Sequence, residues 1–112
     1  MDPGKEIVVG EYTCLVGANA EENWAILEKG KPGYLFFHLS SFPSCYVILQ
    51  TEEKVVDDVI KECARICLEN TKYKNLRKVY VDCTTISNVR KGEKVGEVEY
   101  TSRKKVKQIK LS

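Results

Sequence analysis

The spacing of hydrophobic residues changes along the chain, and the changes predict its elements. Short apolar runs at 11–17, 34–39 and 45–50 are typical of strands, and the turn sequence SSFPS joins the last two. Side chains of a strand alternate between two faces, and in 34–39 both sets are mainly apolar, so we expect both faces to be at least half buried. One face would carry Leu35, Phe37 and Leu39, and the other Tyr34, Phe36 and His38.

Two segments instead have the three- and four-residue spacing of helices. The stretch 20–30 starts with acidic residues and ends in Gly30, which predicts a short helix with its apolar residues turned partly inward. The main helix is predicted over about 52–70, with Thr51 as its cap and Glu52 and Glu53 in its first turn. Its apolar stripe would consist of Val56, Val59, Ile60, Cys63, Ala64 and Cys67.

Three further strands are predicted in the last third of the chain, at 77–83, 95–101 and 105–111. Strands thus precede and follow one main helix, an order typical of α+β proteins. We therefore predict a single α+β domain, 1–112, in which the main helix packs on a largely antiparallel sheet.

Length and composition narrow the class of protein. A chain of 112 residues, 43% of them hydrophobic, is long enough to bury a core without disulfides or a structural metal. The N-terminal sequence MDPGKEIVVGEY does not resemble a secretory signal, and no apolar stretch reaches the roughly 20 residues needed to span a bilayer. We expect a cytosolic or nuclear chain, assigned here to the cytoplasm, whose five cysteines are reduced core thiols.

Charge is distributed unevenly along the chain. Residues 1–70 hold 6 Lys and Arg against 12 Asp and Glu, whereas residues 71–112 hold 12 against 4. A basic face on ordered strands suits a polyanionic partner. Lysines that merely solvate strand faces and protect sheet edges explain the same pattern equally well.

Motifs for catalysis, metal binding or cofactors are weak. Cys63 and Cys67 stand one helical turn apart and could supply two zinc ligands, but they lie on the apolar stripe, no C-x-x-C pair exists, and only one histidine is available. His38 beside Ser40, Ser41 or Ser44 lacks the surroundings of a known nucleophile motif. No phosphate-binding glycine loop is present. We therefore predict a non-enzymatic protein with no metal or cofactor.

From residue 12 onward the sequence resembles the NFACT-R family, the module found in NEMF-type ribosome quality-control proteins and in small stand-alone relatives, which resemble this chain more. The matching segments are YTCLVGANAEEN (12–23), GKPGYLFFHL (30–39), SCYV (44–47), VDCTTISNVRK (81–91) and VGEVEY (95–100). The sequence departs from the family pattern at five positions: Ala18 replaces a basic residue, Trp24 an acidic one, Phe36 a tryptophan, Tyr46 a histidine and Thr85 a proline.

The resemblance implies RNA binding, with tRNA or ribosomal RNA, in the handling of stalled nascent chains, while one stand-alone branch is linked to DNA sensing. Under this hypothesis basic side chains contact phosphates, and His38, Tyr46 and Trp24 stack on unpaired bases, although core packing is preferred for Trp24 and Phe36. The residues assigned to nucleic-acid binding are His38, Tyr46, Ser44, Asn19, Asn23, Asn88, Arg90, Lys91, Arg103, Lys104 and Lys105.

Two other hypotheses stay open. The chain could be a protein-interaction module that docks on a ribosomal or quality-control protein through the 36–46 hairpin. Hydrolase chemistry at His38 is the least favoured alternative, because it requires a nucleophile within hydrogen-bond reach of the ring.

Overall fold

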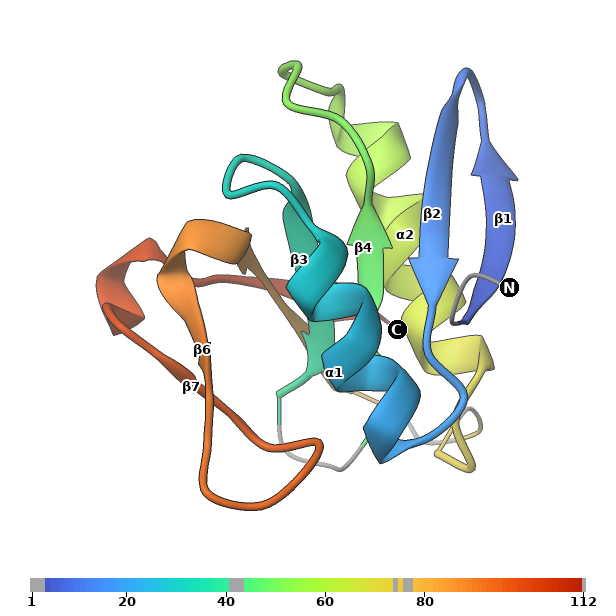
Figure 1. The fold of residues 1–112 in the computed structure, drawn as a ribbon. Helices are drawn as coiled ribbons and strands as arrows, with labels where there is room; N and C mark the ends of the chain where they lie inside the picture. Colours follow the sequence, from blue (N-terminus) through green and yellow to red (C-terminus); the bar gives the residue numbers. More distant parts are fainter. Residues whose placement is uncertain (1–3, 41–43, 74, 76–77, 112) are drawn as a thin grey trace.

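A six-stranded antiparallel sheet forms the centre of the computed structural model, which describes residues 4–40, 44–73, 75 and 78–111 (Figure 1). The spatial order of its strands is β1-β2-β4-β3-β5-β8. Two further strands pair antiparallel in a separate small sheet. The strands of the large sheet are β1 (Lys5–Val9), β2 (Tyr12–Val16), β3 (Leu35–Leu39), β4 (Val47–Leu49), β5 (Val79–Thr85) and β8 (Lys107–Leu111), and those of the small sheet are β6 (Val89–Lys91) and β7 (Val98–Tyr100).

Helices cover the large sheet from both sides. The long helix α2 (Asp57–Glu69) packs on one face, where its buried side chains meet alternate residues of β3 and β5 such as Phe37, Leu39 and Val81. The short helix α1 (Ala20–Lys29), together with β6 and β7, covers part of the other face around Phe36. Short 3-10 turns are η1 (Ile86–Asn88) and η2 (Arg103–Lys105). The predicted α+β class and the helix packed on a largely antiparallel sheet are therefore confirmed.

The predicted alternation in 34–39 is confirmed. Phe36 and Phe37 are neighbours on opposite faces of β3, and both are completely buried. The SSFPS turn that follows falls mostly at residues 41–43, which lie outside the described residues.

The main helix begins later than predicted. It starts at Asp57, Val56 occupies the N-cap position, and the first turn carries Asp57 and Asp58 in place of Glu52 and Glu53. Thr51 is not the cap, because its hydroxyl oxygen accepts a hydrogen bond from the Glu53 amide (3.0 Å) in a local turn that competes with helix formation. Val56 consequently leaves the apolar stripe and is 68% exposed.

The C-terminal strands differ from the prediction in position and pairing. The strand predicted at 77–83 runs over Val79–Thr85, and the one predicted at 105–111 begins at Lys107. Within 95–101 only Val98–Tyr100 is a strand, and it pairs with β6, which was not predicted. The N-terminal strand β1 was also missed, because its only clear signal is the short apolar run IVV.

The five cysteines are free thiols packed between the sheet and α2. Four of them are buried, and the Sγ atoms of Cys14 and Cys63 lie 3.4 Å apart. Burial raises the pKa of Cys83 to about 12, so this thiol stays protonated at neutral pH. The cysteines therefore act as small core residues.

Candidate nucleic-acid interface

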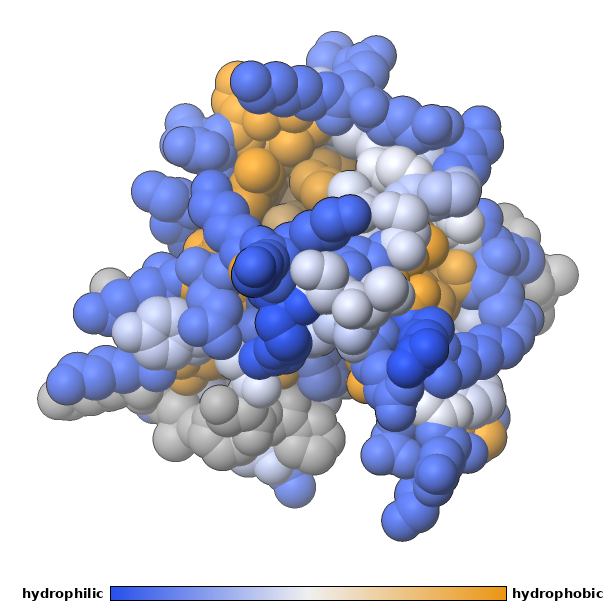
Figure 2. All heavy atoms as spheres, turned by 90° about the vertical axis from the view of Figure 1, so that its left-hand side faces the viewer, coloured by the Kyte–Doolittle hydropathy of each residue, from blue (hydrophilic) through white to orange (hydrophobic). Residues whose placement is uncertain are grey.

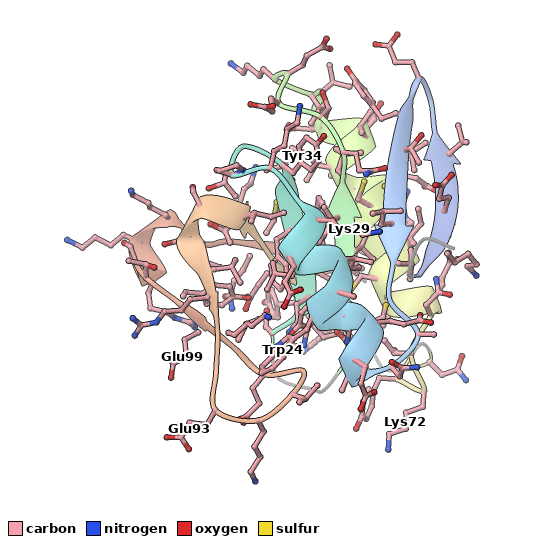
Figure 3. The ribbon with its side chains drawn as sticks, viewed as in Figure 1. Trp24, Lys29, Tyr34, Lys72, Glu93 and Glu99 are labelled. Atoms are coloured by element: carbon pink, nitrogen blue, oxygen red, sulfur yellow. The ribbon has the colours of Figure 1, made fainter. Side chains whose placement is uncertain are left out.

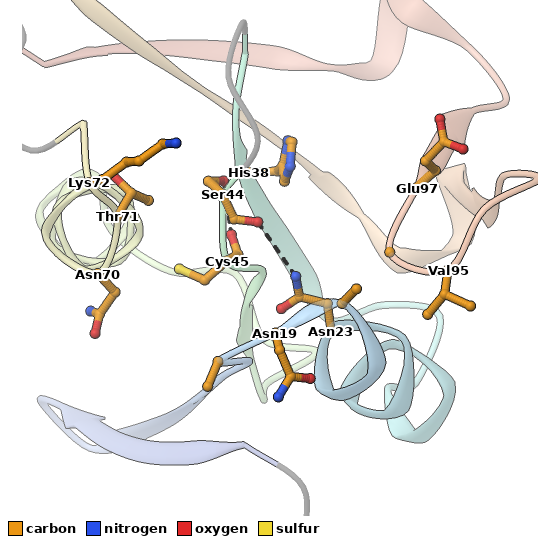
Figure 4. Close-up of a pocket in the computed structure, with 13 residues that line it drawn as sticks. Asn19, Asn23, His38, Ser44, Cys45, Asn70, Thr71, Lys72, Val95 and Glu97 are labelled. Atoms are coloured by element: carbon orange, nitrogen blue, oxygen red, sulfur yellow. Dashed lines mark hydrogen bonds between the residues drawn. The ribbon is translucent and has the colours of Figure 1, made fainter.

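A cavity of about 560 Å³ opens beside the only histidine of the chain (Figure 4). Its walls come from five places in the sequence: the N-terminus of α1, the end of β3, the segment before β4, the residues after α2, and the loop before β7. We call it the His38 cavity. Among its lining residues are Asn19, Asn23, His38, Ser44, Lys72 and Glu97.

His38 is held by aromatic neighbours on the sheet. Its ring stacks on Phe36 with centroids 6.3 Å apart and meets Tyr46 edge-on at 5.5 Å. Burial lowers the pKa of His38 from its ordinary value of 6.5, while the charge of Asp82, its cross-strand partner, opposes the shift. The ring is therefore neutral at physiological pH and is suited to stacking or hydrogen bonding more than to pairing with a phosphate.

This shift predicts a pH-dependent stability. Because the unfolded chain protonates its histidine at about pH 6.5, before the folded chain does, the contribution of His38 to the free energy of unfolding should fall as the pH drops below about 6.5 and stay constant above it. His38→Gln should remove this part of the pH dependence, since the chain has no other histidine. Urea unfolding of both proteins at about pH 7.5 and about pH 5.5 provides the measurement, and parallel losses in the two proteins would contradict the prediction.

Asn19 caps α1. Its side-chain oxygen accepts from the Glu22 amide, and the Glu22 carboxylate accepts from the Ala18 amide, each at 2.9 Å. The first bond satisfies one of the free amides at the helix start, and the second holds the negative charge of Glu22 beside it. The N-terminus of α1 is therefore a poor site for a phosphate. The side-chain oxygen of Asn19 is used in capping, so its side-chain nitrogen is the group available to the cavity.

Asn23 and Ser44 build the wall between α1 and the sheet. The Asn23 side chain accepts from the Tyr46 amide (3.1 Å) and donates to the carbonyl of Ser44 (3.5 Å, dashed in Figure 4). Ser44 Oγ in turn accepts from the amide of Leu39 at 3.0 Å. Both side chains thus keep the cavity in shape, and Asn23 is only 6% exposed.

The prediction that Tyr46 stacks on a base is wrong for this structure. Tyr46 is completely buried, with its ring packed edge-on against Phe36 at 5.0 Å. Its hydroxyl donates to the carbonyl of Gly96 and so ties the loop before β7 to the sheet. A ring with no exposed face cannot receive a base.

Asn88 is likewise a structural residue. It is 3% exposed, its amide nitrogen donates to Thr84 Oγ1 (3.1 Å) and to the Ser102 carbonyl (2.9 Å), and its oxygen accepts from the Ser102 amide (2.8 Å). These bonds join η1 to the segment after β7. The assignment of Asn88 to direct nucleic-acid contact is therefore corrected.

The predicted basic residues lie outside the His38 cavity, on the face formed by β6, β7 and η2. Hydrophilic side chains cover most of this face, with hydrophobic patches between them (Figure 2). Arg90 pairs with Glu99 at 3.1 Å, and Lys91 pairs with Glu28. Arg103 lies over the ring of Tyr100, with its guanidinium carbon 5.4 Å from the centroid. These side chains are exposed, so each pairing is weak enough to be exchanged for a phosphate.

Lys104 and Lys105 differ from their basic neighbours. Both are exposed on η2, and within the described part of the chain neither makes an ion pair. Of the five assigned basic residues, these two have the fewest internal partners among the described residues.

Trp24 connects α1 to the small sheet. Its indole nitrogen donates to the carbonyl of Glu97 (3.0 Å), and the ammonium of Lys91 lies 4.8 Å from the centroid of its ring (Figure 3). Trp24 therefore has the packing role that the sequence analysis preferred for it. The same holds for Phe36, which is completely buried.

Sequence reasoning missed part of the cavity. Lys72 and the loop residues Val95, Gly96 and Glu97 line it, yet they belong to segments with no motif of their own. Their only signal is that VGEVEY falls in the family resemblance. Lys72 belongs to the basic segment 71–112, but nothing in its spacing indicated proximity to His38.

No hydrogen bond within the described residues joins His38 to a serine hydroxyl. Ser40 donates to Asp82 Oδ1 (2.7 Å), and Ser44 donates to the Cys45 carbonyl (3.0 Å), while Ser41 lies outside the described residues. Nor does any group of three or more His, Cys, Asp or Glu there suit a metal ion.

Comparison with known families identifies the family of this chain. The sequence model of the NFACT protein RNA binding domain matches residues 7–102. The chain belongs to this family. The predicted resemblance is thus confirmed, and membership in the NFACT RNA-binding family supports a role in RNA binding.

Relatives of this NFACT-R chain are longer proteins. It is 25% identical, over 94% of its length, to the coiled-coil domain-containing protein 25 homolog of Dictyostelium discoideum, and it covers 55% of that protein. Its fold matches the C-terminal part of the fibronectin/fibrinogen-binding protein from Streptococcus suis with a TM-score of 0.87 and 25% identity, over 100% of this chain and 45% of that one. The NFACT-R chain thus spans about half of the Dictyostelium protein and about half of the solved Streptococcus chain. Within the described residues, no helix is long and apolar enough to cross a membrane.

Proposed function

We propose that this chain binds single-stranded RNA, with one unpaired base at the His38 cavity and the phosphates along the face of β6, β7 and η2. Membership in the NFACT RNA-binding family carries the proposal. The cavity supports it, because it places a neutral aromatic ring between polar side chains that can reach a base.

The chemistry of the cavity suits an unpaired nucleotide. His38 offers a ring face for stacking, and the Asn19 amide and Glu97 carboxylate can bond to the edge of a base. Lys72 stands at the rim opposite Glu97, where its ammonium can meet a phosphate (Figure 4). An RNA duplex keeps its bases stacked inside, so single strands should bind better.

The test is fluorescence anisotropy of labelled single-stranded RNA titrated with the protein at low salt. His38→Ala should weaken binding by about 1–3 kcal/mol, the usual value of one base stacked on an aromatic side chain. Ser87→Ala, an exposed change away from the cavity, is the matched control and should bind like the wild type. Wild-type protein without measurable affinity for any RNA would overturn the proposal.

We further propose that the RNA is tRNA or ribosomal RNA, and that the chain acts in the cytoplasm in translation or ribosome-associated quality control. The resemblance to NEMF-type proteins supports this finer assignment. Crosslinking in cells, followed by sequencing of the bound RNA and mass spectrometry of bound proteins, tests it. Recovery of mainly messenger RNA or DNA would contradict it.

A protein-docking function is the second candidate, and one observation favours it. Val95 is 50% exposed at the edge of the His38 cavity, where an apolar side chain of a partner protein could pack. Capture of a ribosomal or quality-control protein that survives nuclease treatment, but is lost on Val95→Asp, would select docking over RNA binding.

A further inference from the structure

On the side opposite α2, the helices of the described residues leave part of the large sheet uncovered. On the side opposite α2, α1 and the small sheet lie over Phe36 and its neighbours, whereas the ends of β3, β5 and β8 extend beyond them. Side chains of β5 alternate, so Tyr80 lies on this face beside the position of Asp82, while Val79 and Val81 face α2. Tyr80 is 41% exposed, which makes it one of the few large apolar side chains at the surface.

The neighbours of Tyr80 on this face are cationic and polar. Lys110 of β8 is its direct cross-strand partner and is exposed. Gln108, two residues earlier on the same strand, pairs with Asp82 and also donates to Ser40 Oγ at 3.3 Å. Tyr80 is therefore an aromatic ring with an ammonium and hydrogen-bonding groups around it, a combination suited to a nucleotide.

The carboxylate of Asp82, the next residue on this face of β5, is held inward. Asp82 is only 3% exposed, and its two oxygens accept hydrogen bonds from Ser40 (2.7 Å) and Tyr100 (3.0 Å). Gln108 makes a longer contact to Asp82 Oδ1 (3.4 Å). The guanidinium of Arg103, which lies over the Tyr100 ring, is a further positive group near the Asp82 carboxylate. Repulsion between Asp82 and an approaching phosphate is reduced accordingly.

Tyr80 lies close to His38 on the same face of the sheet. His38 is the cross-strand partner of Asp82, so Tyr80, two residues earlier on β5, is its diagonal neighbour on the same face. Such neighbours lie roughly 7–8 Å apart on a sheet. This separation is comparable to that between adjacent bases of an extended single strand.

From this arrangement we propose that Tyr80, flanked by Lys110 and Gln108, is a second base-stacking site, which takes the nucleotide next to the one at the His38 cavity. This inference rests on the proposed RNA-binding function. It adds to that function a defined path for the RNA strand, from the His38 cavity across β5 toward β8. The Lys110 ammonium would contact the phosphate of the nucleotide at Tyr80.

The experiment compares affinities of Tyr80→Ala and Tyr80→Phe for single-stranded oligouridylates of increasing length. Tyr80→Ala should bind the longer oligomers about 5-fold or more weakly, the loss expected of one stacked base, while a mononucleotide that fills only the His38 cavity should be unaffected. Tyr80→Phe keeps the ring and should bind like the wild type. The slope of affinity against salt should not change in Tyr80→Ala, because no charge is removed.

Direct contact is measured by photocrosslinking to 5-bromouridine-containing RNA, with mass spectrometry of the crosslinked peptide. A crosslink at Tyr80 supports the site, and its absence, with crosslinks elsewhere, overturns it. Wild-type affinity of Tyr80→Ala together with weakened binding of His38→Ala would reject this second site and leave the proposed function intact. Absence of RNA binding by the wild type would reject both, and loss of a protein partner in Tyr80→Ala without loss of RNA would reassign the face to protein docking.

Discussion

Reversing the charge of Arg90, Lys91, Arg103, Lys104 and Lys105 to glutamate is expected to reduce RNA affinity at physiological salt below detection. These five side chains are exposed on the face of β6, β7 and η2. Each phosphate contact releases counterions, and five contacts to a single strand correspond to a slope of about −3.5 in a plot of log affinity against log salt. Anisotropy titrations over a salt series measure both the affinity and the slope.

The five positions are not expected to contribute equally to the loss of RNA affinity. Arg90 and Lys91 already pair with Glu99 and Glu28, whereas Lys104 and Lys105 make no ion pair within the described residues. Reversal of Lys104 and Lys105 should therefore cost more affinity than reversal of Arg90 and Lys91.

Glu99→Gln is the matched control, since it frees Arg90 and should strengthen RNA binding. A fivefold-reversed protein that folds, as judged by circular dichroism, yet binds RNA as tightly as the wild type would disprove the assignment of this face.

Tyr46→Ala is expected to have the largest effect on stability, about 3–5 kcal/mol, the usual loss for a buried aromatic residue replaced by alanine. Tyr46 is completely buried against Phe36 and beside His38. Small domains are stable by only about 5–15 kcal/mol, so the variant should unfold at much lower urea concentration.

Tyr46→Phe separates the hydroxyl from the ring. It keeps the packing but loses the hydrogen bond to the Gly96 carbonyl, so about 1–2 kcal/mol should be lost. Urea unfolding followed by circular dichroism measures both variants. Equal losses in Tyr46→Phe and Tyr46→Ala would show that ring packing contributes little, contrary to this account.

The elements that depend on local sequence pattern were predicted correctly. Alternation in 34–39 identified a strand buried on both faces, and the acidic start and glycine end of 20–30 identified α1, because in each case the neighbours in sequence supply the deciding interactions. The start of α2 was misplaced since Thr51 forms a turn with its own neighbour, an interaction that competes with capping.

The candidate site was less predictable, because tertiary contacts decide it. His38 was recognised, but whether a polar side chain faces solvent or closes a gap in the fold depends on segments far away in sequence. Asn88 and Tyr46 both form hydrogen bonds with residues more than ten positions away in sequence, and these bonds give them a structural role. Tyr80 belongs to no motif and became visible only through the pairing of β5 with β3 and β8.

The loop before β7 is anchored through its backbone. Tyr46 and Trp24 donate to the carbonyl oxygens of Gly96 and Glu97, and a side chain at Gly96, where φ is +91°, would collide with Ala20. Every amino acid offers the same carbonyl group, so the anchors place no demand on the side chains of Val95 and Glu97. Proteins with this architecture are therefore free to exchange the chemistry at these two positions, and with it their choice of ligand, while the loop stays in place.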